Sequence, residues 1–293
     1  MHKFKQITIV GCGLLGGSFA LALRRAGWQG TVTVCGGSRS PQLAVELGIA
    51  RAIETSFAKD ETCQSDLIFL AAPIGGIIDF LKKHGHQIKP GAIVTDAGST
   101  KVEICQIANE ALSPEAVFIG GHPMAGSENS GIEYARAELF EGATWALMES
   151  AHESELLEVK ALIEKIGARV LLTRPVEHDQ AVAMISHLPQ LVSSSLADLL
   201  NEENTDLKRR LAATGWRDMT RLAGSSWNVW RDIVLTNQPN ISAAVGALID
   251  ELQILKEALD TRDFNQVREL FSAANQSVET QRSLHYQPFK KLS

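Results

Sequence analysis

A histidine between glycines and a proline marks the first candidate for chemistry. The stretch Gly120–Gly126 reads Gly-Gly-His-Pro-Met-Ala-Gly and follows the apolar run Ala116–Ile119, which predicts a short buried strand. Glycine and proline favour turns, so we expect His122 on a turn rather than inside a strand or helix, with its ring facing a cleft. Open parallel sheets bind ligands at the carboxyl ends of their strands, and this favours a catalytic His122 over a solvated surface-loop histidine.

A glycine-rich motif indicates what that cleft binds. The residues Gly-Cys-Gly-Leu-Leu-Gly, from Gly11 to Gly16, lie between the β-rich run Ile7–Val10 and the helical segment Phe19–Arg25. In this context the first glycine allows a tight turn, the second admits a pyrophosphate, and the third lets helix and strand pack closely. The anion then lies on the helix N-terminus. The predicted cofactor contacts here are Gly11, Gly13, Leu14, Leu15 and Gly16.

The residues after the second predicted strand, Thr31–Cys35, bear on the choice of nucleotide. An acidic residue there would bind the ribose 2′-hydroxyl of NAD, but this chain has Ser38, Arg39 and Ser40 instead. Two hydroxyls and a guanidinium suit a 2′-phosphate. We therefore predict NADP or NAD as cofactor, with NADP favoured. The alternative is that Arg39 caps the next helix in solvent.

Two other predicted strands end at the same edge of the sheet. The apolar run within Ser65–Pro73 fits a strand buried on both faces, and its last residues, Ala72 and Pro73, are predicted cofactor contacts. The strand Ala92–Asp96 leads to Ser99, which is either part of a helix N-cap with Thr100 or a second catalytic residue in the crevice with His122.

The order of elements predicts two domains. Strands are expected at 144–148 and 169–172 with a helix over 153–166 between them, whereas only helical spacing follows Val176. Pro175 marks the boundary. The predicted fold class is α/β: a Rossmann-type doubly wound sheet in residues 1–174, then an all-α domain in residues 175–293. The last ten residues are expected to form a loose tail.

The helical half holds candidate substrate contacts. Arg217 and Arg221 are four residues apart and would share a helix face suited to a carboxylate, unless they pair with neighbouring acids as Arg231 and Asp232 could. His187 precedes Leu188-Pro189, where the proline is expected to kink a helix; a hydrogen-bonded core histidine is the simplest interpretation. The segment 177–179 is interpreted as a capping and charge cluster. The tryptophans 216, 227 and 230 indicate a buried interface or cleft wall.

The composition excludes several classes of function. A net charge of −6 argues against nucleic acid as the main partner. No signal peptide and no run of about 18 apolar residues is present, so we expect a cytoplasmic protein without a membrane partner. The cysteines at 12, 35, 63 and 105 lack CxxC spacing, so neither a metal site nor a disulfide framework is predicted.

Together the motifs resemble those of the prephenate and arogenate dehydrogenase family, NAD(P)-dependent enzymes of tyrosine biosynthesis. The segments that carry the resemblance are Gly11–Ser18, Asp96–Lys101, Gly120–Gly126, His178–Ala181, Ser186–Pro189 and Gly215–Arg221. They occur in the order seen in the family and span nearly the whole chain. The histidine-proline-methionine loop together with the serine-histidine-leucine-proline helix is specific to it.

The resemblance implies an oxidative decarboxylation. It implies that His122 takes the proton of the ring hydroxyl while hydride leaves the ring carbon, and that Ser99 orients both. It also implies that Arg221 binds a substrate carboxylate, that His187 lines the pocket, and that the helical domain forms a homodimer. No fused mutase or regulatory domain is expected in 293 residues. The substrate, prephenate or arogenate, stays open, as do tyrosine inhibition and the roles of His178 and Arg217.

Two other classes were weighed. The first is another Rossmann-plus-helical enzyme, such as a β-hydroxyacid dehydrogenase or an imine reductase. Hydroxyacid dehydrogenases use a lysine of the helical domain, and Lys208 is the only lysine from Val176 to Asn240. The second is a non-enzymatic NAD(P) sensor, against which the presence of His122, Ser99 and Arg221 argues.

Overall fold

The computed structural model describes residues 4–36, 40–50, 52–54, 64–126, 131–202 and 206–285. The strands are β1 (Gln6–Val10), β2 (Thr31–Cys35), β3 (Ala52–Glu54), β4 (Leu67–Leu70), β5 (Ile93–Asp96), β6 (Val117–Ile119), β7 (Gly121–Pro123), β8 (Thr144–Met148) and β9 (Arg169–Thr173). The α-helices are α1 (Leu14–Arg25), α2 (Ser40–Glu46), α3 (Ile74–His84), α4 (Val102–Ala111), α5 (Glu153–Lys165), α6 (Pro175–Val182), α7 (Leu188–Glu202), α8 (Asp206–Leu211), α9 (Thr214–Thr220), α10 (Trp227–Thr236), α11 (Gln238–Asp260) and α12 (Phe264–His285). Short helical turns are η1 (Gly85–Gln87), η2 (Ile132–Tyr134), η3 (Ala183–His187) and η4 (Arg221–Gly224).

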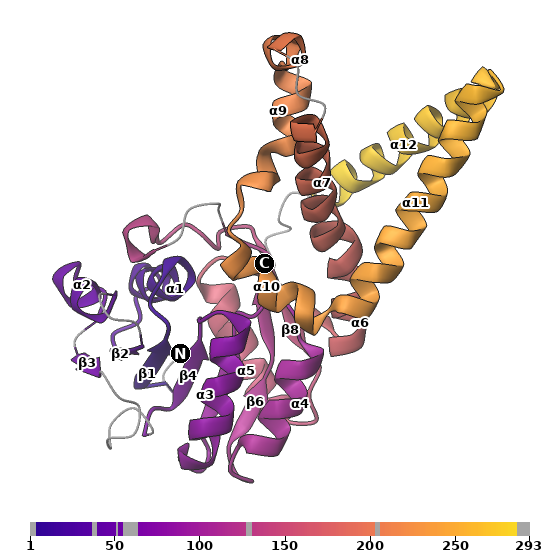
Figure 1. Cartoon of the computed structure of the whole chain (residues 1–293). Coiled ribbons are helices and arrows are strands. Elements are labelled where there is room, and N and C mark those ends of the chain that lie inside the picture. The colour runs from indigo at the N-terminus through magenta and orange to yellow at the C-terminus, as the bar shows by residue number, and fades with distance from the viewer. Residues whose placement is uncertain are drawn as a thin grey trace. The chain divides into compact units, whose positions relative to one another are not determined.

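The N-terminal half is built on a parallel sheet in the order β3-β2-β1-β4-β5-β6 (Figure 1). Its strands are apolar on both faces, because helices cover both sides. Ile9 packs in the core on the side of Phe19 in α1, whereas Val10 packs on the other side with Ile77 of α3. This arrangement confirms the predicted doubly wound sheet. Since the strands are parallel, the segments after β1, β4, β5 and β6 all begin at one edge.

A smaller sheet, β7-β8-β9, continues from that edge, and it corrects one prediction. His122 lies in the middle of β7, opposite Ala146 of the antiparallel strand β8, and not on a turn. The glycines before it do not break the ladder, since the Gly120 carbonyl accepts from Met148 N at 2.8 Å. Trp145 of β8 packs its ring 6.0 Å from that of Phe69, which joins this sheet to the larger one.

Beyond β9 every regular element among the described residues is helical, as predicted. Pro189 does not kink a continuous α-helix: it is the second residue of α7, and the irregularity lies just before it, in the π-helical turn η3. Proline has no N–H to donate and crowds the preceding turn, and a wider π turn relieves both problems. No described helix has the length and apolar character that a membrane span requires.

Contacts between residues divide the chain into two units, 1–241 and 242–293. The helices α6–α10 fall in the first unit because they contact the nucleotide-binding half, as α6 does at α4 and α10 at α3. The second unit holds most of α11 and all of α12, which form a helical hairpin turning at Arg262, with a φ of 59°. The predicted domain boundary at Pro175 stays a prediction. The predicted tail lies almost entirely outside the described residues.

Candidate active site

The crevice after β1 has the geometry that a dinucleotide needs. Gly11 has a φ of +88°, and a Cβ atom there would lie 2.8 Å from the backbone of Ala71. At Gly16 a Cβ atom would lie 2.2 Å from the Gly11 carbonyl oxygen, whereas the space beside Gly13 is open to 4 Å. No side chain caps α1 at Gly13, so its first N–H groups are available to an anion.

A pocket of about 470 Å³ occupies this crevice and gathers several predicted cofactor contacts. It is lined by Gly11 and Gly13 from one loop and by Ala72 and Pro73 from the next. Leu14 and Leu15 are half-buried in the first turn of α1. Ser38 and Arg39 lie outside the described residues, as does the side chain of Ser40 at the start of α2. The predicted NADP preference therefore rests on the sequence.

His122 is the centre of a chain of hydrogen-bonded side chains. Only 9% of its surface is exposed. Its Nδ1 lies 2.9 Å from Nε2 of His178, and Nδ1 of His178 lies 2.8 Å from Oδ1 of Asp179. Burial lowers the pKa of His122 well below its usual value, and the positive charges that His178 and Lys101 can carry lower it further. The ring is therefore neutral at pH 7 and can accept a proton.

Asp179 also holds the start of α4. Its Oδ1 accepts a hydrogen bond from the backbone N–H of Lys101 at 2.7 Å, and its Oδ2 accepts one from Val102 at 2.9 Å. The expected cap of this helix by Ser99 or Thr100 is therefore wrong. A carboxylate from α6 takes the free N–H groups instead, because it can reach two of them at once. Ser99 is half-buried in the loop before α4.

A buried ion pair holds the residue before His122. The ammonium of Lys101 contacts the carboxylate of Asp96, and both side chains are fully buried. Oδ1 of Asp96 accepts from the Gly121 N–H at 2.9 Å, while Nζ of Lys101 donates to the Gly121 carbonyl oxygen at 2.8 Å. A side chain at Gly121 would clash with the Asp96 carbonyl, 2.8 Å from the Cβ position. The pair thus holds both backbone polar groups of Gly121, the residue before the histidine.

His187 joins the same cluster through Asn237. The Asn237 amide donates to the Asp179 carbonyl oxygen at 2.8 Å and lies 3.2 Å from Nδ1 of His187. A carbonyl can only accept, so the amide nitrogen is the donor, and Nδ1 of His187 is the acceptor. Burial lowers the pKa of His187 to about 4. Its ring therefore carries one proton, on Nε2, and meets the edge of Trp230.

The two candidate arginines do not share one α-helix. Arg217 lies in α9, and Arg221 begins the 3-10 turn η4; both are exposed and pair with no acid among the described residues. The buried side chain of Gln190 tethers η4, since its amide donates to the Leu222 carbonyl at 2.7 Å. Trp227 is 62% exposed, so the chain by itself does not bury the tryptophan cluster.

Asp232 ties the helical segment to the nucleotide crevice. Its Oδ2 accepts from the Gly75 N–H at 2.8 Å, in the first turn of α3 and two residues after Pro73. Its Oδ1 pairs with Arg231 at 2.8 Å. Arg231 is thus engaged by its neighbour, which is the pairing that the sequence offered as the alternative to carboxylate binding.

Comparison with known proteins identifies the family. The family description "Prephenate dehydrogenase, nucleotide-binding domain" matches residues 19–172, and "Prephenate dehydrogenase, dimerization domain" matches residues 174–273. The chain belongs to the prephenate dehydrogenase family. The predicted fold class and enzyme class, a prephenate or arogenate dehydrogenase, are therefore confirmed.

Members of the family with known names or structures cover most of the chain. The prephenate dehydrogenase of Lactococcus lactis subsp. cremoris is 34% identical over 87% of this chain and 70% of its own length. The structure of the Aquifex aeolicus enzyme with hydroxyphenyl propionate and NAD+ has a TM-score of 0.88 and 33% identity, covering 94% of this chain and 98% of that one. Synechocystis arogenate dehydrogenase has a TM-score of 0.81 and 30% identity, covering 94% and 99%.

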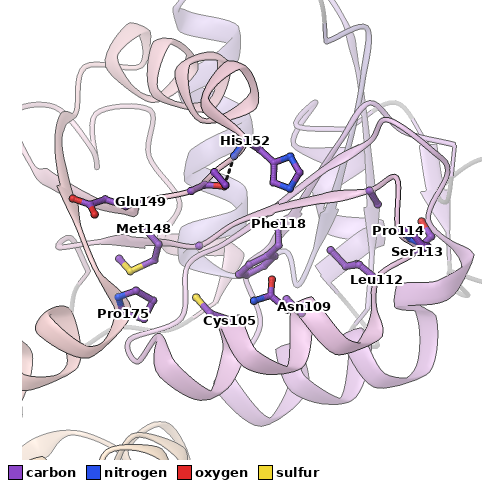
Figure 2. Close-up of a pocket in the computed structure, with 15 residues that line it drawn as sticks. Cys105, Asn109, Leu112, Ser113, Pro114, Phe118, Met148, Glu149, His152 and Pro175 are labelled. Atoms are coloured by element: carbon purple, nitrogen blue, oxygen red, sulfur yellow. Dashed lines mark hydrogen bonds between the residues drawn. The ribbon is translucent and has the colours of Figure 1, made fainter.

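A further pocket, of about 420 Å³, is shown in Figure 2, and its lining includes none of the three histidines 122, 178 and 187. Cys105 of α4 and Met148, the last residue of β8, both line it. It approaches the active-site strand only at Gly120. His152 is among its lining residues, but none of the residues that line this pocket also lines the nucleotide crevice, so it is not placed to take part in hydride transfer.

Sequence reasoning missed the residues that position the histidines. His178 and Asp179 were interpreted as part of a capping and charge cluster at the start of their own helix, yet both are buried and support His122 and α4. Asn237 and the Asp96–Lys101 pair were not singled out. A signal was present: His178-Asp179 precedes an apolar helical run, where an unpaired charge would be costly, and Asp96 ends a buried strand.

Proposed function

We propose that His122 is the base in an NAD(P)-dependent oxidative decarboxylation of prephenate or arogenate. One observation carries this assignment: a buried, neutral histidine ring, held by other side chains, at the sheet edge where the glycine crevice opens. The hydroxyphenyl propionate and NAD+ held by the Aquifex aeolicus enzyme support a cyclohexadienol substrate and a nicotinamide cofactor for this chain as well.

The residues of this chain would act in sequence on the ring hydroxyl. His122 accepts a hydrogen bond from that hydroxyl and takes its proton as C4 loses hydride. The nicotinamide, when bound, accepts the hydride. The ring carboxylate then leaves as carbon dioxide, and its bonding electrons make the ring aromatic. Ser99, in the loop after β5, orients the hydroxyl toward His122.

Substrate carboxylates are assigned to the helical segment. Arg221 is the first candidate because its guanidinium is exposed and unpaired among the described residues while its backbone turn is tethered to α7. Arg217 is the second. His187 would donate from Nε2 to a substrate oxygen, since Asn237 already occupies its Nδ1.

Four broader proposals accompany this assignment. NADP is favoured over NAD because Ser38, Arg39 and Ser40 replace the usual acid. The family's dimerization domain and the exposed Trp227 support a homodimer formed by the helical domain. We place the start of that domain at Pro175; the first family description ends at residue 172 and the second begins at residue 174, which supports a boundary there. Cys12 and Cys105 form no disulfide among the described residues, which fits the cytoplasm.

The test is a two-by-two assay. Purified protein is given prephenate or arogenate, each with NAD or NADP, and formation of the reduced nicotinamide is followed by absorbance. Turnover in one or more combinations supports the proposal, and the ratios give the substrate and cofactor preference. No turnover in any of the four contradicts it and favours a nucleotide sensor of the same fold.

A further inference from the structure

The three side chains behind His122 form a directional series. His122 lies in β7, while His178 and Asp179 come from α6, and the contacts run from Nδ1 of His122 to Nε2 of His178, then from Nδ1 of His178 to the Asp179 carboxylate. His178 and Asp179 are 4% and 1% exposed. The carboxylate is held in place from the opposite side by the N–H groups of Lys101 and Val102.

Hydrogen-bond chemistry fixes the direction of the series. An ionised carboxylate can only accept, so Nδ1 of His178 carries a proton and donates it to Asp179. In neutral His178 the other nitrogen, Nε2, is then an acceptor. Nδ1 of His122 must therefore donate to it, which leaves Nε2 of His122 without a proton. Nε2 of His122, which has no partner among the described residues, is thus the nitrogen able to accept a proton from substrate.

We propose that His178 and Asp179 are a positioning relay that keeps Nε2 of His122 unprotonated and holds the substrate's proton during turnover. This inference rests on His122 being the base of the proposed reaction. When His122 takes the hydroxyl proton on Nε2, its Nδ1 proton passes to Nε2 of His178. The resulting imidazolium lies against the Asp179 carboxylate, which stabilises the charge as the triad carboxylate of serine proteases does.

The overall reaction returns the proton to the oxygen it came from, so the proton needs a temporary acceptor and no exit to solvent. The substrate loses a hydride from C4, a proton from its hydroxyl and carbon dioxide from C1. The electrons of the C1–carboxylate bond return to the C4 oxygen as the ring becomes aromatic, giving a phenolate. That oxygen then takes back the stored proton, and the product leaves as a phenol. No net proton is therefore released at this oxygen.

The charged groups around His122 favour storage on His178 rather than on His122. Burial and the ammonium of Lys101, in the loop before α4, both lower the pKa of His122, and Asp96 is already paired with Lys101. The Asp179 carboxylate, by contrast, contacts His178 and not His122. A proton taken from substrate is therefore better stabilised one ring further from the reacting carbon.

The test uses three variants of the full chain. Asp179→Asn turns the carboxylate into an amide that can donate to His178, which would reverse the proton positions in both rings. We expect kcat to fall on the order of 10²- to 10⁴-fold with KM and cofactor affinity nearly unchanged. His178→Leu should lower kcat similarly, and it leaves the Asp179 contacts to α4 in place. His178→Gln can still accept from His122 but cannot store a proton, so its kcat should fall in between.

A second readout does not depend on turnover. In ¹⁵N-labelled chain without cofactor, long-range ¹H–¹⁵N spectra report which ring nitrogen of each histidine carries a proton, and His122→Asn identifies the His122 signals. We expect a proton on Nδ1 of His122 in the wild type and on Nε2 in Asp179→Asn. His86→Gln, an exposed histidine on η1, is the matched control and should change neither readout.

The outcomes separate the relay from the base. A proton on Nε2 of wild-type His122 would overturn the relay. So would His178→Leu turning over within about threefold of wild type while His122→Asn is inactive, and the proposed function would then stand. If His122→Asn itself remained active, the proposed function would fail. Should Asp179→Asn not fold, the kinetics of the two His178 variants and the wild-type spectrum decide.

Discussion

Nζ of Lys101 donates to the carbonyl oxygen of Gly121 at 2.8 Å, one residue before His122 in the chain. The same ammonium contacts Asp96, which accepts from the Gly121 N–H. Parallel strand β5 and the start of β7 are thus joined by a buried pair of opposite charges. This contact places the active-site strand, because the backbone N–H and C=O of Gly121 are both held by side chains that have no access to water.

We predict that Lys101→Met destabilises the chain. Removing one partner of a buried ion pair leaves the other uncompensated, at a cost of about 3–5 kcal/mol. Urea unfolding measures the change, with the exposed Lys82→Met on α3 as control, for which less than about 0.5 kcal/mol is expected. Equal stability of the two variants would show that the Lys101 charge does not hold this edge.

We predict that Arg221→Ala raises KM for the substrate more than it lowers kcat. A guanidinium that binds a carboxylate stabilises the bound substrate and the transition state equally. Its loss therefore raises KM by about 10-fold or more. Steady-state kinetics of Arg221→Ala and Arg217→Ala, side by side, measure it. An unchanged KM in Arg221→Ala with a raised KM in Arg217→Ala would move the carboxylate site to α9.

The buried His187 predicts a loss of stability in acid. Its pKa is about 4 in the folded chain against 6.5 in the unfolded one. Between pH 4 and pH 6.5 the unfolded chain binds a proton at His187 and the folded chain does not. The free energy of unfolding is therefore highest above pH 6.5 and falls as the pH drops toward 4, by at most about 3 kcal/mol.

His187→Gln should make that fall shallower, though not flat, since burial also lowers the pKa of His122. Unfolding free energies at a series of pH values check this. The exposed His86→Gln should keep the wild-type slope. Superimposable curves for wild type and His187→Gln would mean that His187 is protonated in the folded state.

We predict that Arg39→Ala weakens the binding of NADP more than the binding of NAD. A guanidinium beside the 2′-phosphate contributes a charge-assisted contact that NAD cannot use, so the KM ratio should shift toward NAD by about 10-fold. Kinetics with both cofactors measure the ratio. If both KM values rose equally, Arg39 would contact a part shared by the two cofactors.

The fold followed from the sequence where local patterns decide it. The apolar strand ending at Leu70 and the glycines 11, 13 and 16 have strong local signals, because burial on both faces and close backbone approach restrict residue type directly. His122 was identified from its neighbours, yet its placement in a strand was missed, because pairing with Ala146 depends on residues more than twenty positions away.

The supporting contacts could not be read in the same way. Asp179 caps α4 across 78 residues, and Asn237 reaches His187 across 50. Such contacts depend on how α6 and α10 pack against the sheet edge, and the spacing of apolar residues in the sequence does not predict that packing. Serine and threonine are common N-cap residues, which is why Ser99 or Thr100 was expected to cap α4. A carboxylate distant in the sequence binds two of the free N–H groups instead.

The most direct test of the account is the rate of hydride transfer in His122→Asn. Asparagine fills similar space but cannot take a proton, so the account predicts a single-turnover rate lower by about 10² or more, with cofactor affinity and unfolding free energy close to wild type. Stopped-flow absorbance of the reduced nicotinamide, with the substrate and cofactor that the wild type prefers, measures it. A rate within about threefold of wild type would contradict the account and remove His122 as the base.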